Sequence, residues 1–189
     1  MARLDGGGME RRMQYDAVAR ACHWLTVALV VAIVPVGLVM GDLPRGALQD
    51  ALFRTHESLG LSVLALTLLR LAWRLAHRPP PPSPALTRLE RGASSSVHAL
   101  LYLVLLAMPV SGYLFVSFRG IELSYFGLFD VPSLVEQAKP ASDLALSVHM
   151  TLQWVIYALV ALHAGAALNH FFRRRDDVLQ RMLPAARRR

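Results

Sequence analysis

The chain alternates between long apolar stretches and short segments that carry most of its charge. Four stretches come close to the about 20 apolar residues that a helix needs to cross a bilayer, and they cover residues 17–41, 56–77, 95–118 and 143–172. Each is longer than an ordinary strand. The pattern predicts an all-α fold, an integral membrane four-helix up-down bundle that forms one domain.

Proline and polar residues mark the connections between these spans. Four consecutive prolines, residues 79–82, end the second span and form a stiff extended linker. The 119–142 connection interleaves aromatic with polar residues, and we expect it to place a short element in the outer membrane interface. We divide the chain into a flexible N-terminal tail (1–14), a four-helix transmembrane domain (15–184) and a basic C-terminal tail (185–189).

The distribution of charge predicts the orientation of the spans. Of the 20 basic residues, all but Arg45, Arg54, Arg119 and Lys139 lie within residues 1–20, the 70–91 connection or residues 173–189. The positive-inside rule therefore places both termini in the cytoplasm. The net charge of +7 follows from this topology, and arginine clusters at a helix exit are typical of contact with anionic membrane lipid. We expect no nucleic-acid partner.

Histidine, rather than cysteine, carries the chemistry of the spans. Cys22 is the single cysteine, so the sequence has no disulfide framework, no CxxCH haem attachment and no CxxC metal pair. At least five of the seven histidines lie in predicted spans, where an ionisable side chain is a functional hypothesis by default. A single histidine could equally well hydrogen-bond across the bundle, so the hypothesis depends on how several are arranged.

The directions of the spans sort these histidines into two levels. His23 and His98 fall near cytoplasmic ends of spans, and His56 falls near an outer end. His149 and His163 are 14 residues apart on the fourth span, so they share one face and lie about 21 Å apart along its axis. Imidazole is a ligand of haem iron, and two axial imidazoles leave no open position for oxygen. The arrangement predicts two haems b that relay electrons along the membrane normal.

The predicted depth in the membrane assigns a unique pair of histidine ligands at the outer level only. His56 and His149 are the two at the outer level, and we pair them as ligands of an outer haem. At the inner level His163 could pair with either His23 or His98, and spacing does not choose between them.

Other residues at the inner level are candidates for secondary roles. Arg20, Arg70 and Arg74 could bind haem propionates, although positive-inside charge explains them equally well. His170 lies about two turns beyond His163 and shares its face, so it could contact a substrate or a propionate. His77, at the exit of the second span, is interpreted as an interfacial residue.

Several segments around these residues follow one another in a specific order. They are RACHW from Arg20, HESLG from His56, HALLY from His98 with MPVSG from Met108, HMTL from His149, HAGAALNH from His163 and LQRMLP from Leu179. In that order they resemble the bacterial cytochrome b561 family of small four-helix di-haem membrane cytochromes. The resemblance covers roughly residues 14–184, which makes 15–184 a transmembrane cytochrome b domain.

The resemblance implies roles that the spacing leaves open. It implies His23 and His163 as ligands of the inner haem, His56 and His149 as ligands of the outer haem, and His98 and His170 as histidines near the haem or a quinone. It also implies a location in the bacterial inner membrane. The closest pattern is that of the superoxide oxidases, which oxidise superoxide at the periplasmic face and pass electrons to ubiquinone.

The expected function is therefore that of an oxidoreductase of the superoxide:ubiquinone type, with membrane lipid, quinone and superoxide as partners. Because the outer loops are net acidic, attraction of superoxide would need a local patch formed by the four outer basic residues. Tyr102 and Trp154 join His98 and His170 as candidates for contact with quinone. The alternatives are a haem-binding membrane anchor that takes electrons from a redox partner protein, a haem-free histidine-lined transporter, and a purely structural anchor.

Overall fold

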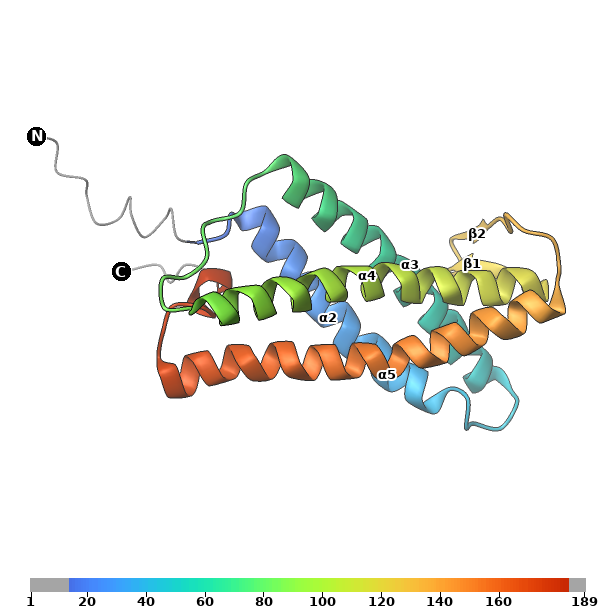
Figure 1. The fold of residues 1–189 in the computed structure, drawn as a ribbon. Coiled ribbons are helices and arrows are strands. Elements are labelled where there is room, and N and C mark those ends of the chain that lie inside the picture. The colour runs from blue at the N-terminus through green and yellow to red at the C-terminus, as the bar shows by residue number, and fades with distance from the viewer. Residues whose placement is uncertain (1–13, 184–189) are drawn as a thin grey trace, which may run out of the picture.

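In the computed structural model, four long helices follow one another, each antiparallel to the next (Figure 1). They are α2 (Ala17–Val39), α3 (Ala47–Ala76), α4 (Arg88–Arg119) and α5 (Lys139–Asn169). All four are long and apolar enough to cross a membrane, and side chains such as Leu75, which is 80% exposed, face outward as lipid contacts would require. The predicted all-α four-helix membrane fold is confirmed.

The structure describes residues 14–183. Apart from residue 14, the predicted tails, 1–14 and 185–189, lie outside the described residues.

Three helices, α3, α4 and α5, begin before the predicted apolar spans, whereas α2 ends two residues short of its predicted span. α3 begins at Ala47, nine residues before the predicted start, because its first turns carry polar residues that still favour helix. α4 begins at Arg88, where Thr87 and Glu90 form a reciprocal capping box. After α5 the chain continues as the π-helix η1 (His170–Arg174) and, further on, the 3-10 helix η2 (Gln180–Met182).

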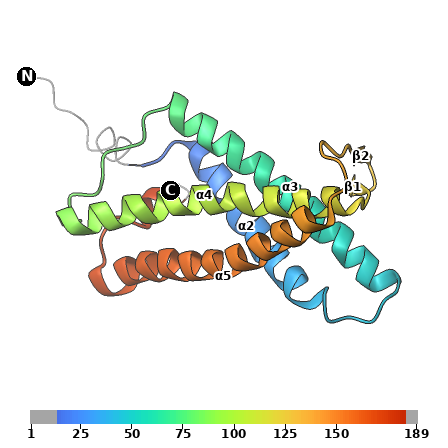
Figure 2. The ribbon, with the colours of Figure 1, turned by 45° about the vertical axis from the view of Figure 1, so that its right-hand side comes forward.

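The four helices form two hairpins. α2 packs on α3, α4 packs most extensively on α5, and contacts of α3 with α4 join the two pairs (Figure 2). A cluster of buried apolar side chains lies between α4 and α5 and is centred on Val104, Ile156 and Leu159. Because α4 and α5 supply this cluster, they provide a rigid support for side chains above and below it.

The connection between α4 and α5 contains a two-stranded antiparallel sheet, which the sequence pattern did not predict. Its strands are β1 (Leu123–Tyr125) and β2 (Phe129–Val131). The turn between them includes Phe126 at φ 49° and Gly127 at φ 70°. The Phe126 amide donates to Ser58 Oγ over 2.9 Å, so the hairpin is fixed to α3 two residues after His56.

A segment that follows α5 closes the opposite end of the bundle. Arg181, which is 6% exposed, donates from Nε to Asp177 Oδ2 over 2.7 Å and from Nη1 to the Pro81 carbonyl over 2.6 Å. Asp177 also accepts a hydrogen bond from Ser83. These contacts fasten the C-terminal segment to the proline-rich linker between α3 and α4.

We expect replacement of Asp177 by asparagine to lower the thermal stability of this end at neutral pH. Burial opposes ionisation, but hydrogen bonds from Ser83 and Arg181 outweigh it and hold the pKa of Asp177 below its ordinary value of 3.8. Because the folded pKa is the lower one, the contribution is complete above the ordinary value and is lost as pH falls through the folded value.

Thermal unfolding of detergent-solubilised protein checks this expectation. Asp177→Asn should unfold a few degrees lower than the parent near pH 7, and the two should converge only at a pH well below 3.8. Asp130→Asn, on the exposed strand β2, is the matched control and should unfold with the parent. An equal difference at both pH values would contradict the assigned role of the carboxylate.

Candidate functional site

Two histidines face one another in the half of the bundle that lies next to the β1–β2 hairpin. The rings of His56 on α3 and His149 on α5 have centroids 6.1 Å apart and planes inclined by 75°. A glycine of the neighbouring helix supports each ring. A Cβ at Gly37 would lie 3.0 Å from His56 Cε1, and one at Gly112 would lie 3.2 Å from His149 Cε1. Larger side chains would displace the rings, so the glycines make room for this pair.

The His149 ring has a defined hydrogen-bonded orientation. Its Nδ1 lies 3.0 Å from the Met108 carbonyl oxygen and 3.2 Å from Ser111 Oγ. A neutral imidazole that donates Nδ1–H to this carbonyl keeps its Nε2 lone pair for a metal. In contrast, Nδ1 of His23 and Nδ1 of His56 are buried without a hydrogen-bond partner among the described residues.

Three histidines meet at the other level. The His23 and His163 ring centroids are 6.2 Å apart with planes inclined by 74°. His98 approaches His163 more closely, with centroids 5.2 Å apart. The structure therefore places both of the inner candidates beside His163.

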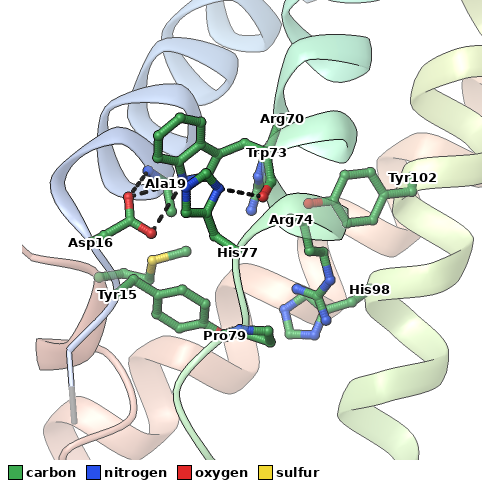
Figure 3. A pocket seen from close by; sticks show the side chains of 11 residues that line it. Tyr15, Asp16, Ala19, Arg70, Trp73, Arg74, His77, Pro79, His98 and Tyr102 are labelled. Carbon is green, nitrogen blue, oxygen red and sulfur yellow. Dashed lines mark hydrogen bonds between the residues drawn. The ribbon is translucent and has the colours of Figure 1, made fainter. Parts of the chain in front are cut away.

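A pocket opens beside these inner histidines, where the end of α3 meets the starts of α2 and α4. Figure 3 shows His98 and Tyr102 reaching from α4 toward Arg74 on α3. The guanidinium carbons of Arg70 and Arg74 lie 5.4 Å and 5.9 Å from the centre of the Tyr102 ring. Within residues 14–183 neither arginine forms an ion pair with a carboxylate. The pocket thus presents two uncompensated positive charges.

On the side of the pocket away from His98, a contact joins α2 to α3. His77 stacks on the Trp73 ring at 3.8 Å, and Trp73 Nε1 donates to Asp16 Oδ1 over 3.1 Å (Figure 3). Burial opposes ionisation of Asp16, but hydrogen bonds from Ala19 and Trp73 keep the pKa of its carboxyl below the ordinary value. His77 lies at the rim of the pocket.

Other sequence candidates make different contacts. Arg20 donates to Gln14 Oε1 and to the Leu183 carbonyl, and so joins the segment before α2 to the segment that follows α5. His170 is buried, and its Nδ1 lies 2.6 Å from Asp176 Oδ2. Trp154 is 69% exposed on α5, so it faces away from the histidines.

Sequence reasoning missed two features of the site. The first is the Met108 carbonyl, because a backbone acceptor leaves no mark in side-chain spacing. The second is Trp24, whose ring contacts His23 with centroids 5.3 Å apart and whose Nε1 donates to the Met182 carbonyl over 2.8 Å. The segment RACHW contains Trp24, but nothing in the sequence links it to the C-terminal segment.

The fold and the histidine geometry define a class of protein: a four-helix membrane protein that pairs imidazoles at two depths, as membrane electron-transfer cytochromes do. Residues 14–185 match the prokaryotic cytochrome b561 family, and the chain belongs to that family. Its function is membrane electron transfer, and membership implies binding of haem b.

Individual relatives match over nearly their whole length. Cytochrome b561 homolog 2 of Escherichia coli (strain K12) is 34% identical over 90% of this chain and 91% of its own. Cytochrome b561 homolog 1 of the same organism is 32% identical over 86% and 92%. A probable superoxide oxidase, CybB, of Yersinia pestis is 29% identical over 92% and 98%. The predicted family is confirmed.

Replacing Gly112 by valine should weaken haem binding at the outer histidine level. The new side chain begins 3.2 Å from His149 Cε1 and must displace the ring. Overpacking of this kind costs about 1–3 kcal/mol, so haem affinity there should fall about tenfold or more.

Haem per chain, measured on purified protein by pyridine haemochrome, tests this prediction. Gly165→Val is the matched control, since a Cβ at Gly165 meets nothing within 4 Å. Unchanged haem content in Gly112→Val would show that the ring can move without loss of the site.

Proposed function

We propose that the chain holds two haems b, one at each histidine level. His23 and His163 would be the axial ligands of the inner haem, and His56 and His149 those of the outer haem. The observation that supports this most directly is the separation of the paired rings. With metal–imidazole bonds of about 2 Å and a ring nitrogen about 1 Å from its ring centre, two rings on opposite sides of an iron have centres about 6 Å apart. The separations of 6.2 Å and 6.1 Å fit this requirement.

The same comparison favours His23 over His98 as the partner of His163. The His98 ring centre lies 5.2 Å from that of His163, about 1 Å short of the spacing that two opposed ligands need. His98 instead lines the inner pocket and is placed in the vicinity of the haem, in accord with the family resemblance.

The surrounding residues have supporting roles in this proposal. When bound, each haem supplies a centre that gains and loses one electron. Arg70 and Arg74 have free guanidinium donors in the inner pocket and would bind propionates. Gly37 and Gly112 allow close approach at the outer level. Arg20 is the weaker candidate for a propionate, because its Nη1 already donates to Gln14 and Leu183.

The proposed reaction is oxidation of superoxide at the periplasmic face and reduction of ubiquinone. Two superoxide anions give two molecules of oxygen and two electrons, and ubiquinone takes these electrons with two protons to become ubiquinol. The similarity to a probable superoxide oxidase over 98% of its length supports this assignment. It implies a bacterial inner-membrane protein with both termini in the cytoplasm, in accord with the distribution of basic residues.

The four outer basic residues differ in how far carboxylates balance their charge, which bears on which of them would attract superoxide. Arg119 and Lys139 share one carboxylate, Asp143, at 3.5 Å and 2.6 Å, so one of their two positive charges is balanced. Arg45 and Arg54 form no ion pair with a carboxylate among the described residues. Arg54 lies two residues before His56, so it is the outer cation best placed to attract an anion to that level.

The two other histidines of the spans, His98 and His170, are the candidates to lie near a quinone or a haem. His98 opens onto the inner pocket, beside Tyr102 and the two arginines of α3. His170 has its Nδ1 engaged by Asp176, which leaves Nε2 for a ligand.

The proposal is tested on purified protein from haem-replete cells. We expect two haems per chain and loss of superoxide that depends on added ubiquinone. His149→Ala should retain one haem, because it removes a ligand from the outer level only. His98→Ala, the matched control on the same type of residue, should retain both.

Each contrary outcome identifies a different error. A colourless preparation would favour a haem-free transporter. Two haems with no consumption of superoxide, together with a stable partner in pull-down, would favour a membrane-anchor subunit of a separate dehydrogenase or reductase. Loss of haem from His98→Ala but not from His23→Ala would reverse the inner ligand assignment.

A further inference from the structure

The two histidine levels differ in how their imidazoles are hydrogen-bonded. At the outer level, His149 Nδ1 lies 3.0 Å from the Met108 carbonyl oxygen, which is the usual bond that makes a ligating imidazole more basic. Nδ1 of His56 at the outer level and Nδ1 of His23 at the inner level are both buried with no such partner among the described residues, so the levels differ by the one bond at His149. A more basic ligand donates more electron density and favours oxidised iron, so this bond lowers the reduction potential of the outer level.

The positive charge of the bundle is concentrated at the inner level. Arg70 lies close enough to His23 and His163 to act electrostatically on both rings. Arg74 acts in the same way on His98 and shares the Tyr102 face with Arg70. Because neither has a carboxylate partner in residues 14–183, their charge is not cancelled by the protein. Uncompensated positive charge favours the reduced state of a nearby centre.

At the outer level the nearby cation, Arg54, is not among the groups that act electrostatically on the histidine rings. Among the described residues, no arginine acts electrostatically on His56 or His149. The ionisable neighbour along the chain is Glu57, which directly follows His56 and is half-buried, with Arg54 as its nearby cation. A carboxyl group here opposes reduction when ionised and adds no stabilisation when neutral.

We propose that these residues make the inner haem the one of higher potential, so that electrons pass from the outer to the inner level. The inference rests on the two-haem assignment above. In each transfer one electron leaves the outer level, which is oxidised, and reduces the inner level. The external one-electron donor replaces it, and the acceptor withdraws electrons from the inner level. Each haem would carry propionates of the same charge, so the propionates cancel in the comparison and the two arginines remain as the difference between the levels.

Potentiometric titration of the purified holoprotein tests the order of the two levels. The outer band is identified as the one missing from His149→Ala, and it should titrate at the lower potential in the parent protein. An outer band at the higher potential, or at the same potential, would overturn the inference while leaving the two-haem assignment intact. A preparation with fewer than two haem bands would reject the assignment itself.

Variants that remove a charge test whether the arginines set the order of the two potentials. Arg74→Gln should lower the midpoint of the inner band and leave the outer band unchanged, and Arg70→Gln should do so more strongly because Arg70 acts electrostatically on both His23 and His163. Arg78→Gln, which removes the same charge beyond the end of α3, is the matched control and should move neither band. Glu57→Gln should leave the inner band unchanged and should not lower the outer one.

Haem content is measured on each variant so that loss of haem is not mistaken for a shift. If Arg70→Gln loses the inner haem, Arg74→Gln decides the question. An inner midpoint in Arg74→Gln equal to that of the parent, with both haems retained, would show that the arginines do not set the order.

Discussion

The structure depends on pairs of imidazoles that face one another across the boundary between two helical hairpins. A histidine inside an apolar bundle is costly unless it has a partner, because its ring nitrogens cannot reach water. The protein partners are few: among the described residues, Nδ1 of His23 and of His56 have none. The paired rings are nevertheless held at 6.1 Å and 6.2 Å, a separation that suits a metal between them. Haem would therefore join the hairpins as well as carry electrons.

The two hairpins repeat one arrangement. α2 carries His23 and, 14 residues later, Gly37, while α4 carries His98 and, 14 residues later, Gly112. In each hairpin the glycine supports the outer histidine of the following helix. α5 breaks the repeat, because it bears a second histidine, His163. This extra ring faces two equivalent neighbours, which is why depth in the sequence could not choose between them.

The sequence predicted the number and class of the helices because apolar length is a strong signal in a bilayer. It predicted their ends less well. The first turns of α3 mix polar with apolar residues and are helical through propensity, and α4 begins at a capping box. A short element was expected in the 119–142 connection, but its form as a β hairpin was not, because three-residue strands have no measurable period. Its position depends on hydrogen bonds to α3, from the Phe126 amide to Ser58 and between Tyr125 and Ser62, which spacing does not encode.

The site shows the same division between what spacing specifies and what it does not. Spacing along one helix is fixed by the helix itself, so the common face of His149 and His163 followed from the sequence. Contacts between helices depend on crossing angles that spacing does not encode. The Met108 carbonyl beneath His149 and the separation of His98 from His163 are both of this kind.

One consequence links the rigid part of the fold to its function. α5 supplies a ligand candidate at each level, and the apolar cluster around Ile156 and Leu159 lies between those two histidines on the same helix. The distance between the levels is therefore fixed by a continuous helix packed along α4 and does not depend on loops. The remaining ligand candidates, His23 and His56, come from the other hairpin, which is held by the C-terminal segment at one end and by the β1–β2 hairpin at the other. In the proposed two-haem protein, small movements between the hairpins would alter the fit at each iron and leave the spacing of the two levels constant.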